Sequence, residues 1–230
     1  MFRFKQFTVA DERSTQKVCT DSVLLGAWAP LPSEGRILDV GTGCGILALQ
    51  CAQRTACQVE GIDIHEPSVQ QARENFRNSP WAGRLVAMCI SLQKYKPDVV
   101  FDAIISNPPY FSNSLKSPKA LRNTARHDEE LPLDDFFYHS ARLLSPRGTV
   151  SLCLPMAEYE RALTLAAAHG FFLRSVLYVR GGENSDPYLV LFAFGTAAVT
   201  PVSAELNIRD REGKYTEAYR LLTQGFYLDF

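Results

Sequence analysis

The amino-acid sequence predicts an α/β fold organised around a parallel sheet, and three observations lead to this prediction. A short apolar strand, residues 36–40, runs directly into a glycine-rich turn and then into a helical stretch. Further apolar segments alternate with helical patterns, as in folds that cover a parallel sheet with helices. A second apolar run, residues 99–105, stops at two consecutive prolines, which donate no ladder hydrogen bonds.

The composition is that of an ordinary soluble globular protein, with 46% hydrophobic and 21% charged residues. A formal net charge of −1 gives no overall basic field, so a nucleic-acid partner must be met by a local patch. Apolar runs fall short of the roughly 20 residues that cross a bilayer, and the N-terminus lacks the apolar core of a signal peptide. We therefore expect a cytoplasmic protein with no membrane partner.

The cysteines are scattered and lack the paired spacing of metal ligands. We expect reduced structural thiols and no bound metal. The six are Cys19, Cys44, Cys51, Cys57, Cys89 and Cys153.

Aromatic and polar side chains alternate in residues 2–18, which favours a short hairpin that turns near residues 11–14. Thr20 and Asp21 then offer an N-cap to the apolar helical segment 23–29. Two interpretations of this helix stay open. It covers one edge of the sheet, or its start also lines a cofactor site.

The first strand leads into Gly41, Thr42, Gly43, Cys44 and Gly45, and residues 46–54 form the following helix. Strand, glycine turn and helix together are the context in which such a motif binds a ligand, because glycine allows positive φ and close backbone approach. The second strand, residues 57–63, ends in an acid about 20 residues past the turn, where a carboxylate can accept hydrogen bonds from ribose hydroxyls.

The remaining elements follow in order, and we find no repeat or linker, so one domain is expected over residues 1–230. It comprises an N-terminal hairpin and helix extension (1–35), a catalytic core (36–196) and a C-terminal strand and helix extension (197–230). The later elements are a helix opened by Pro67, strand 85–90, strand 99–105, helix 133–144, strand 149–154, helix 157–169 closed by Gly170, strands 172–179 and 188–194, and helix 215–224.

The sequence Asn107-Pro108-Pro109-Tyr110 follows strand 99–105, at the strand end where ligands of open α/β sheets bind. The side-chain oxygen of Asn107 and the carbonyl of Pro108 are two acceptors that suit an amine with two N–H donors. Tyr110 offers a flat face for a planar ring. The alternative is a proline-rich turn with an Asn cap and a buried Tyr.

A long polar stretch, residues 111–130, comes next and carries several basic side chains. Beside a base-binding turn they form a positive patch for phosphates, and a solvated loop is the equally weighted alternative. The basic residues singled out are Lys116, Lys119, Arg122 and Arg126.

The order of elements resembles the class I methyltransferases that use S-adenosyl-L-methionine, from about residue 37 to 194. Residues 38–45 resemble their first cofactor motif, and Asp63 matches the acid that holds the ribose. Residues 107–110 match the motif of members that methylate amines of adenine, cytosine or glutamine. The resemblance implies a Rossmann-like, seven-stranded, mostly parallel sheet with an antiparallel last strand and helices on both faces.

Segments near both ends are similar to the bacterial tRNA(Val) adenine-N6 methyltransferase family, namely residues 4–7, 17–30, 79–82 and 215–219. This resemblance implies tRNA as partner, through the anticodon loop of tRNA(Val), and adenine 37 as target. One position departs from the pattern, since relatives place an acid after the third strand where this chain has Ser91. A hydroxyl accepts a hydrogen bond from the adenine amine of the cofactor more weakly than a carboxylate does.

The resemblance assigns catalytic roles to Asn107, Pro108, Pro109 and Tyr110. It assigns cofactor binding to Asp39, Gly41, Thr42, Gly43, Gly45, Asp63, Ile64, Ser91 and Asn107.

We expect methyl transfer from S-adenosyl-L-methionine to adenine N6 in tRNA. A protein-glutamine N5 methyltransferase is a first alternative, although related glutamine enzymes carry a sizeable helical N-terminal domain and only about 35 residues precede the first strand here. Adenine-N6 methylation of ribosomal RNA or DNA, and a non-catalytic cofactor-binding module, are the others.

Overall fold

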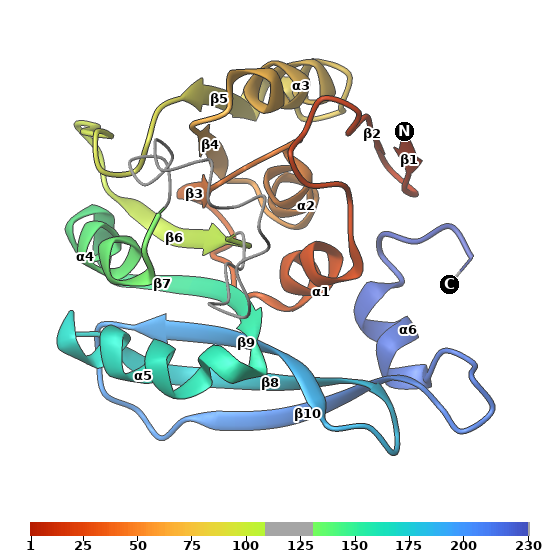
Figure 1. Ribbon diagram of the computed structural model, residues 1–230. Coiled ribbons are helices and arrows are strands. Elements are labelled where there is room, and N and C mark those ends of the chain that lie inside the picture. Colours follow the sequence, from red (N-terminus) through yellow and green to blue (C-terminus); the bar gives the residue numbers. More distant parts are fainter. Residues whose placement is uncertain (109–130, 230) are drawn as a thin grey trace, which may run out of the picture.

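The computed structural model describes residues 1–108 and 131–229. Its centre is an eight-stranded sheet in the order β10-β8-β9-β7-β6-β3-β4-β5 (Figure 1). Strand β9 runs antiparallel to both of its neighbours, and every other neighbouring pair is parallel. The strands are β3 (Arg36–Val40), β4 (Gln58–Asp63), β5 (Leu85–Cys89), β6 (Phe101–Ser106), β7 (Leu144–Pro155), β8 (Phe172–Gly182), β9 (Pro187–Gly195) and β10 (Val202–Arg209).

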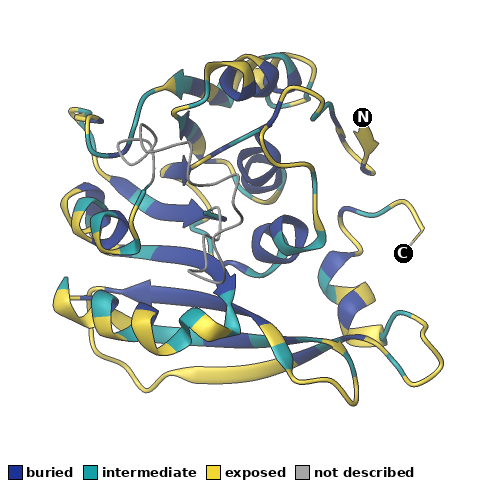
Figure 2. Ribbon diagram, viewed as in Figure 1, coloured by how far each residue is buried: buried dark blue, intermediate teal, exposed yellow. Residues whose placement is uncertain are grey.

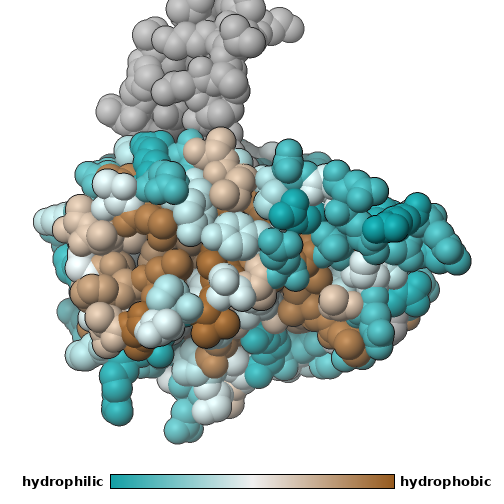
Figure 3. Space-filling model, turned by 90° about the horizontal axis from the view of Figure 1, so that it is seen from below, coloured by the Kyte–Doolittle hydropathy of each residue, from teal (hydrophilic) through white to brown (hydrophobic). Residues whose placement is uncertain are grey.

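The mostly parallel sheet is confirmed, but the expected number of seven strands is wrong. Strand β10 adds an eighth strand by pairing in parallel with β8, so the antiparallel strand β9 is not the last one in the chain. The residues of β10 are mostly exposed, including Val202 at 67%. Figure 3 shows the molecule from below relative to Figure 1, and apolar and polar side chains are mixed on this face. A sparsely buried edge strand leaves little hydrophobic pattern to read in the sequence.

Helices cover both faces of the sheet, as expected, and each face has its own hydrophobic cluster (Figures 1 and 2). One cluster takes residues from α1, α2, α3 and α6, and the other takes residues from α4 and α5. The helices are α1 (Thr20–Trp28), α2 (Ile46–Arg54), α3 (Glu66–Arg77), α4 (Leu133–Leu143), α5 (Tyr159–Ala168) and α6 (Glu217–Thr223), with short 3₁₀ turns η1 (Ala82–Arg84) and η3 (Met156–Glu158).

The central strands are buried on both faces. In β6, Ile104 packs into one hydrophobic cluster and Ile105 into the other, and both are fully buried. Such strands read as continuous apolar runs because neither side faces water. Their carboxyl ends consequently meet at one rim of the sheet, where the polar residues that follow them are brought together.

The N-terminal hairpin is formed by β1 (Phe2–Arg3) and β2 (Thr8–Val9), and its turn lies earlier than expected. The chain reverses over residues 4–7, where the Phe4 N–H donates to the Phe7 carbonyl at 2.9 Å. The rings of Phe4 and Phe7 stack with 4.7 Å between centroids and both are buried, so packing sets the position of this turn. The expected turn at residues 11–14 is a separate bend after the hairpin.

The N-cap of helix α1 lies one residue before Thr20, the first of the two expected capping residues. Cys19 occupies the N-cap position without a side-chain capping bond, and Thr20 and Asp21 are already helical. Among the residues that the structure describes, no helix combines the length and apolar character needed to cross a membrane. No disulfide links the six cysteines.

Candidate active site

The glycine turn between β3 and α2 has the backbone that only glycine adopts easily. Gly41, Gly43 and Gly45 have φ values of 72°, 54° and 86°. The backbone N–H groups of Gly41 and Thr42 both donate to the Ile62 carbonyl, at 2.8 and 3.0 Å, which fastens the turn to β4. These positive φ angles explain the glycine spacing in the sequence.

Asp39 supports this turn from within the protein. Its Oδ2 accepts hydrogen bonds from Thr42 Oγ1 at 2.7 Å and from the Ala48 N–H at 3.1 Å. The side chain is fully buried, and this loss of solvation raises the pKa of the Asp39 carboxyl to about 7. Direct contact of Asp39 with a cofactor therefore stays a prediction, while its hold on Thr42 and on the start of α2 is a feature of the fold.

Asp63 is the last residue of β4, and its carboxyl group bonds both the glycine turn and the start of α3. Its Oδ2 accepts a hydrogen bond from the Gly43 N–H at 2.9 Å, and its Oδ1 accepts one from the His65 N–H at 2.9 Å. The residue is half-buried, and its neighbour Ile64 is 47% exposed. The Ile90 N–H donates to the Asp63 carbonyl, which brings the segment carrying half-buried Ser91 alongside.

Asn107 lies directly after β6 and is 8% exposed. Its Nδ2 donates to Ser22 Oγ at 2.8 Å, and the Cys153 thiol donates to its Oδ1 at 2.9 Å. The side chain lines a pocket together with the glycine turn, so the two motifs singled out in the sequence meet in space. The pocket is lined by Gln16, Lys17, Ser22, Gly41, Thr42, Gly43, Cys44, Ile46, Leu47 and Asn107.

Pro108 is half-buried beside Asn107. The other residues expected around the substrate lie outside the described residues. They are Pro109, Tyr110, Lys116, Lys119, Arg122 and Arg126.

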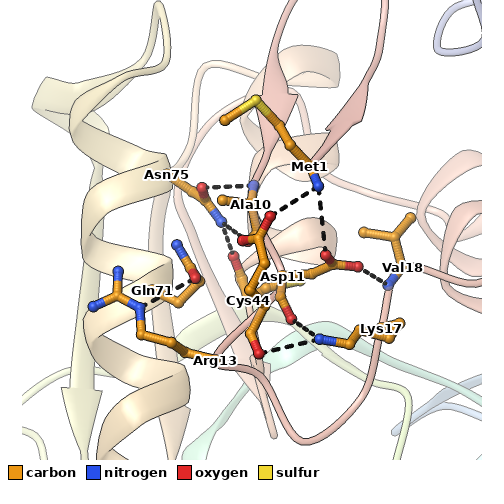
Figure 4. Close-up of polar contacts among 10 residues, drawn as sticks. Met1, Ala10, Asp11, Arg13, Lys17, Val18, Cys44, Gln71 and Asn75 are labelled. Atoms are coloured by element: carbon orange, nitrogen blue, oxygen red, sulfur yellow. Dashed lines mark hydrogen bonds and ion pairs between the residues drawn. The ribbon is translucent and has the colours of Figure 1, made fainter.

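Residues 10–18 run across the glycine turn and are tied down by polar contacts (Figure 4). Asn75 on α3 exchanges two hydrogen bonds with the backbone of Ala10, at 2.7 and 3.0 Å, and also donates to the Cys44 carbonyl at 2.8 Å. Lys17 donates to the Asp11 carbonyl at 2.6 Å, and the Asp11 carboxylate accepts from the Val18 N–H at 3.0 Å. This anchoring brings Gln16 and Lys17 to the pocket.

Sequence reasoning did not assign Gln16, Lys17 or Cys153 to the site, because contacts across the fold bring them there. Ser22 shows that the start of α1 lines the pocket, while Val23 and Leu24 in the same helix are buried in the core. The expectation that this helix covers an edge of the sheet is wrong, because α1 packs on β7 in the interior of the sheet. That its start also lines a cofactor site stays a prediction.

Comparison with known proteins shows the family of this chain. A model of the methyltransferase small domain matches residues 14–154. The tRNA1(Val) (adenine(37)-N6)-methyltransferase of Phocaeicola vulgatus is 40% identical over 228 residues, which cover 99% of this chain and 97% of that protein. The enzyme of the same description from Parabacteroides distasonis is 39% identical and covers 99% and 97%. The chain belongs to the tRNA1(Val) (adenine(37)-N6)-methyltransferase family.

The fold agrees with this membership. The crystal structure of a predicted O-methyltransferase from Agrobacterium tumefaciens superimposes with a TM-score of 0.71 at 17% identity, covering 90% of this chain and 96% of that one. The protein is thus a methyltransferase, and its cofactor is S-adenosyl-L-methionine.

The residues of the rim fit this cofactor. A Cβ at Gly41 would meet no atom within 4 Å, so the turn presents open backbone to a ligand. The half-buried carboxyl group of Asp63 can accept hydrogen bonds from ribose hydroxyls, and the exposed side chain of Ile64 beside it is apolar. As predictions from these positions, the glycine turn would hold the methionine part, Asp63 the ribose, and Ile64 with Ser91 the adenine.

Proposed function

We propose that this protein methylates the exocyclic N6 amine of adenine 37 in tRNA(Val). The observation that carries the proposal is the position of Asn107, whose side chain lines the same pocket as Gly41, Thr42 and Gly43. The relatives named for this reaction match 99% of the chain, so the proposal is supported by more than the fold that methyltransferases share. When bound, S-adenosyl-L-methionine supplies an electrophilic methyl group on a sulfonium sulfur.

The amine of adenine is a poor nucleophile because its lone pair is delocalised into the ring. Asn107 and Pro108 follow one another at the end of β6. In this mechanism Asn107 Oδ1 and the Pro108 carbonyl would accept hydrogen bonds from the two amine protons. Two acceptors favour a more tetrahedral nitrogen whose lone pair is no longer conjugated with the ring and can attack the methyl group. Catalysis then rests on orientation and fixed dipoles.

A separate strong base is not needed before transfer, because the nitrogen becomes acidic once it carries the new methyl group. Tyr110 would hold the adenine ring by stacking, which is worth roughly 1–3 kcal/mol for a base on an aromatic side chain. The base must leave its stack to reach the turn after β6, and an anticodon loop makes this easy because its bases are unpaired.

The test is nucleoside mass spectrometry of purified tRNA(Val) from cells with and without this gene. We expect N6-methyladenosine at position 37 to disappear on deletion and to return with the wild-type gene. An unrelated tRNA from the same cells is the control. Unchanged modification of tRNA(Val) would contradict the proposal.

A biochemical assay separates the alternatives with one enzyme preparation. Purified protein receives S-adenosyl-L-methionine with a tritiated methyl group and, in parallel reactions, unmodified tRNA(Val), ribosomal RNA, DNA or a release factor. The proposal expects label in tRNA(Val). Label in the release factor would establish glutamine methylation instead, and binding of the cofactor without label in any substrate would indicate a non-catalytic module.

A further inference from the structure

The amide of Asn107 is held from two sides by buried side chains. Ser22 on α1 accepts from Nδ2 at 2.8 Å, and Cys153 on β7 donates to Oδ1 at 2.9 Å. Cys19 Sγ is a weaker acceptor of the same Nδ2, at 4.0 Å. The exposed fractions of Asn107, Ser22 and Cys153 are 8%, 6% and 0%. Buried hydrogen bonds fix a side chain more firmly than exposed ones, because breaking them leaves polar atoms unpaired away from water.

The two partners agree on one orientation of the amide. A thiol donates a hydrogen bond but accepts only weakly, so the amide atom that faces Cys153 is the oxygen. The nitrogen then faces Ser22, whose hydroxyl oxygen is a good acceptor. A flipped amide would direct N–H groups at the sulfur and exchange its good acceptor for a poor one.

The fold gives both partners fixed positions. In the register of β6 and β7, Ser106 lies opposite Leu152, so the next residues along, Asn107 and Cys153, lie side by side. Strand β7 is paired on its other side with β9, where Cys153 lies opposite Leu191. Ser22 belongs to the first turn of α1, which packs on α2 and on the sheet.

We propose that Ser22 and Cys153 are positioning residues that set the amide of Asn107 for methyl transfer. This inference rests on the proposed function, in which Asn107 Oδ1 accepts a hydrogen bond from the target amine. A carbonyl oxygen has two acceptor sites, so a bond from the thiol is compatible with a bond from the amine. A thiol is also a weak donor, and it draws less electron density from the oxygen than a hydroxyl or an N–H would.

The role assigned to Ser22 and Cys153 is orientation, and it predicts a particular kinetic signature. Loss of either contact lets the amide sample other rotations. Cys153 is fully buried and does not line the pocket, and Ser22→Ala removes a single hydroxyl from the lining, so the surfaces for substrate and cofactor stay nearly unchanged. The cost then falls on kcat and leaves the tRNA KM and the cofactor Kd near their wild-type values.

The experiment compares Ser22→Ala, Cys153→Ala and Cys153→Ser in the tritium assay on tRNA(Val), with cofactor affinity and melting temperature measured for each. We expect kcat to fall about tenfold in both alanine variants, the effect of losing roughly one hydrogen bond in the transition state. The tRNA KM and the cofactor Kd should change less than about twofold. The Cys153→Ser variant, which restores a donor of similar size, should recover most of the lost rate.

Cys51→Ala is the matched control, because Cys51 is also a fully buried thiol but lies in the middle of α2. It should keep the wild-type kcat despite the same loss of a sulfur atom from the core. An equal loss of rate in Cys51→Ala and Cys153→Ala would overturn the inference, since the effect would then come from packing.

Asn107→Ala separates this inference from the proposed function. If Asn107→Ala is inactive while Ser22→Ala and Cys153→Ala keep the wild-type kcat, the positioning role is wrong and the catalytic role of Asn107 stands. If Asn107→Ala still methylates tRNA(Val) at the wild-type rate, both roles are wrong.

Discussion

The carboxylate of Asp63 accepts a hydrogen bond from the backbone N–H of Gly43, with 2.9 Å between Oδ2 and N. This bond joins the end of β4 to the turn that follows β3, so the acid and the glycine turn form one unit. The second carboxylate oxygen accepts from the His65 N–H, which fixes the start of α3 to the same group. The positions predicted to hold different parts of the cofactor are thus joined by hydrogen bonds within the protein.

We expect Asp63→Asn to weaken binding of S-adenosyl-L-methionine about tenfold or more, because a charged acceptor for ribose hydroxyls is replaced by an amide. Isothermal titration calorimetry measures the change. Glu66→Gln makes the same acid-to-amide change at an exposed position nearby on α3 and should leave the affinity almost unaltered. Equal affinities for the two variants would rule out Asp63 as a cofactor ligand.

Gly45 tests how tightly the glycine turn is packed. Its φ is 86°, and a Cβ there would lie 2.4 Å from a ring carbon of Phe76 on α3. We expect Gly45→Ala to lower the free energy of unfolding by about 2–4 kcal/mol, from backbone strain and overpacking together. Gly83→Ala is the control, because a Cβ at Gly83 meets no atom within 4 Å. Denaturant titration that found similar stability for both variants would contradict both the backbone strain and the overpacking at Gly45.

The sequence predicted this turn well because its conformation is local. Residues Arg36–Val40 and Ile46–Arg54 form the strand and helix with the expected bounds, since apolar periodicity and glycine both act over a few residues. The positions of Asp63, Ser91 and Asn107 followed from the same reasoning, because each lies at the end of a strand or within two residues after it. The pocket does bring Asn107 to Gly41 and Gly43, as expected.

What the sequence could not provide depends on contacts between distant segments. The hydrogen bond between Cys153 and Asn107 follows from the register of β6 and β7, which no local pattern reports. The hairpin turn was misplaced because the packing of Phe4 on Phe7 decides it. The sequence does not predict strand β10, because an exposed edge strand carries little hydrophobic periodicity.

Asp39 should make stability depend on pH. Its pKa is raised to about 7 by burial, from 3.8 for an ordinary Asp, so the folded protein holds this proton over a range in which the unfolded chain has lost it. The stability that this proton gives is complete below about pH 4 and is lost as the pH rises through 7, at up to about 1.4 kcal/mol per pH unit.

The measurement compares wild type with Asp39→Asn, which cannot ionise, by denaturant unfolding from pH 5 to pH 8 without cofactor. We expect the wild-type stability to fall relative to that of the variant as the pH rises. Only the difference in slope is used, because the amide also alters the hydrogen bonds to Thr42 and Ala48. Parallel pH profiles would mean that Asp39 is ionised throughout.

The resemblance to class I methyltransferases predicts that Ser91 takes the position of an acid that binds the adenine amine of the cofactor. Ser91 is half-buried in the segment that the Ile90 N–H ties to the Asp63 carbonyl at 2.9 Å. We expect Ser91→Asp to tighten cofactor binding several-fold, because a carboxylate accepts the bond from the adenine amine more strongly than a hydroxyl does. Ser91→Ala should weaken it. Calorimetry that ranked the three proteins in any other order would remove Ser91 from the adenine site.

Asn107 provides the most direct test of the chemistry. We expect Asn107→Ala to reduce kcat on tRNA(Val) by about a thousandfold, comparable to the loss of one donor from a preorganised oxyanion hole, because the acceptor that shapes the target amine is gone. Affinity for S-adenosyl-L-methionine should stay within about threefold, since the glycine turn and Asp63 keep their mutual hydrogen bond. Single-turnover assays and calorimetry measure the two quantities separately. If Asn107→Ala lost cofactor affinity and rate in equal proportion, Asn107 would be a ligand of the cofactor and would not be the acceptor for the target amine.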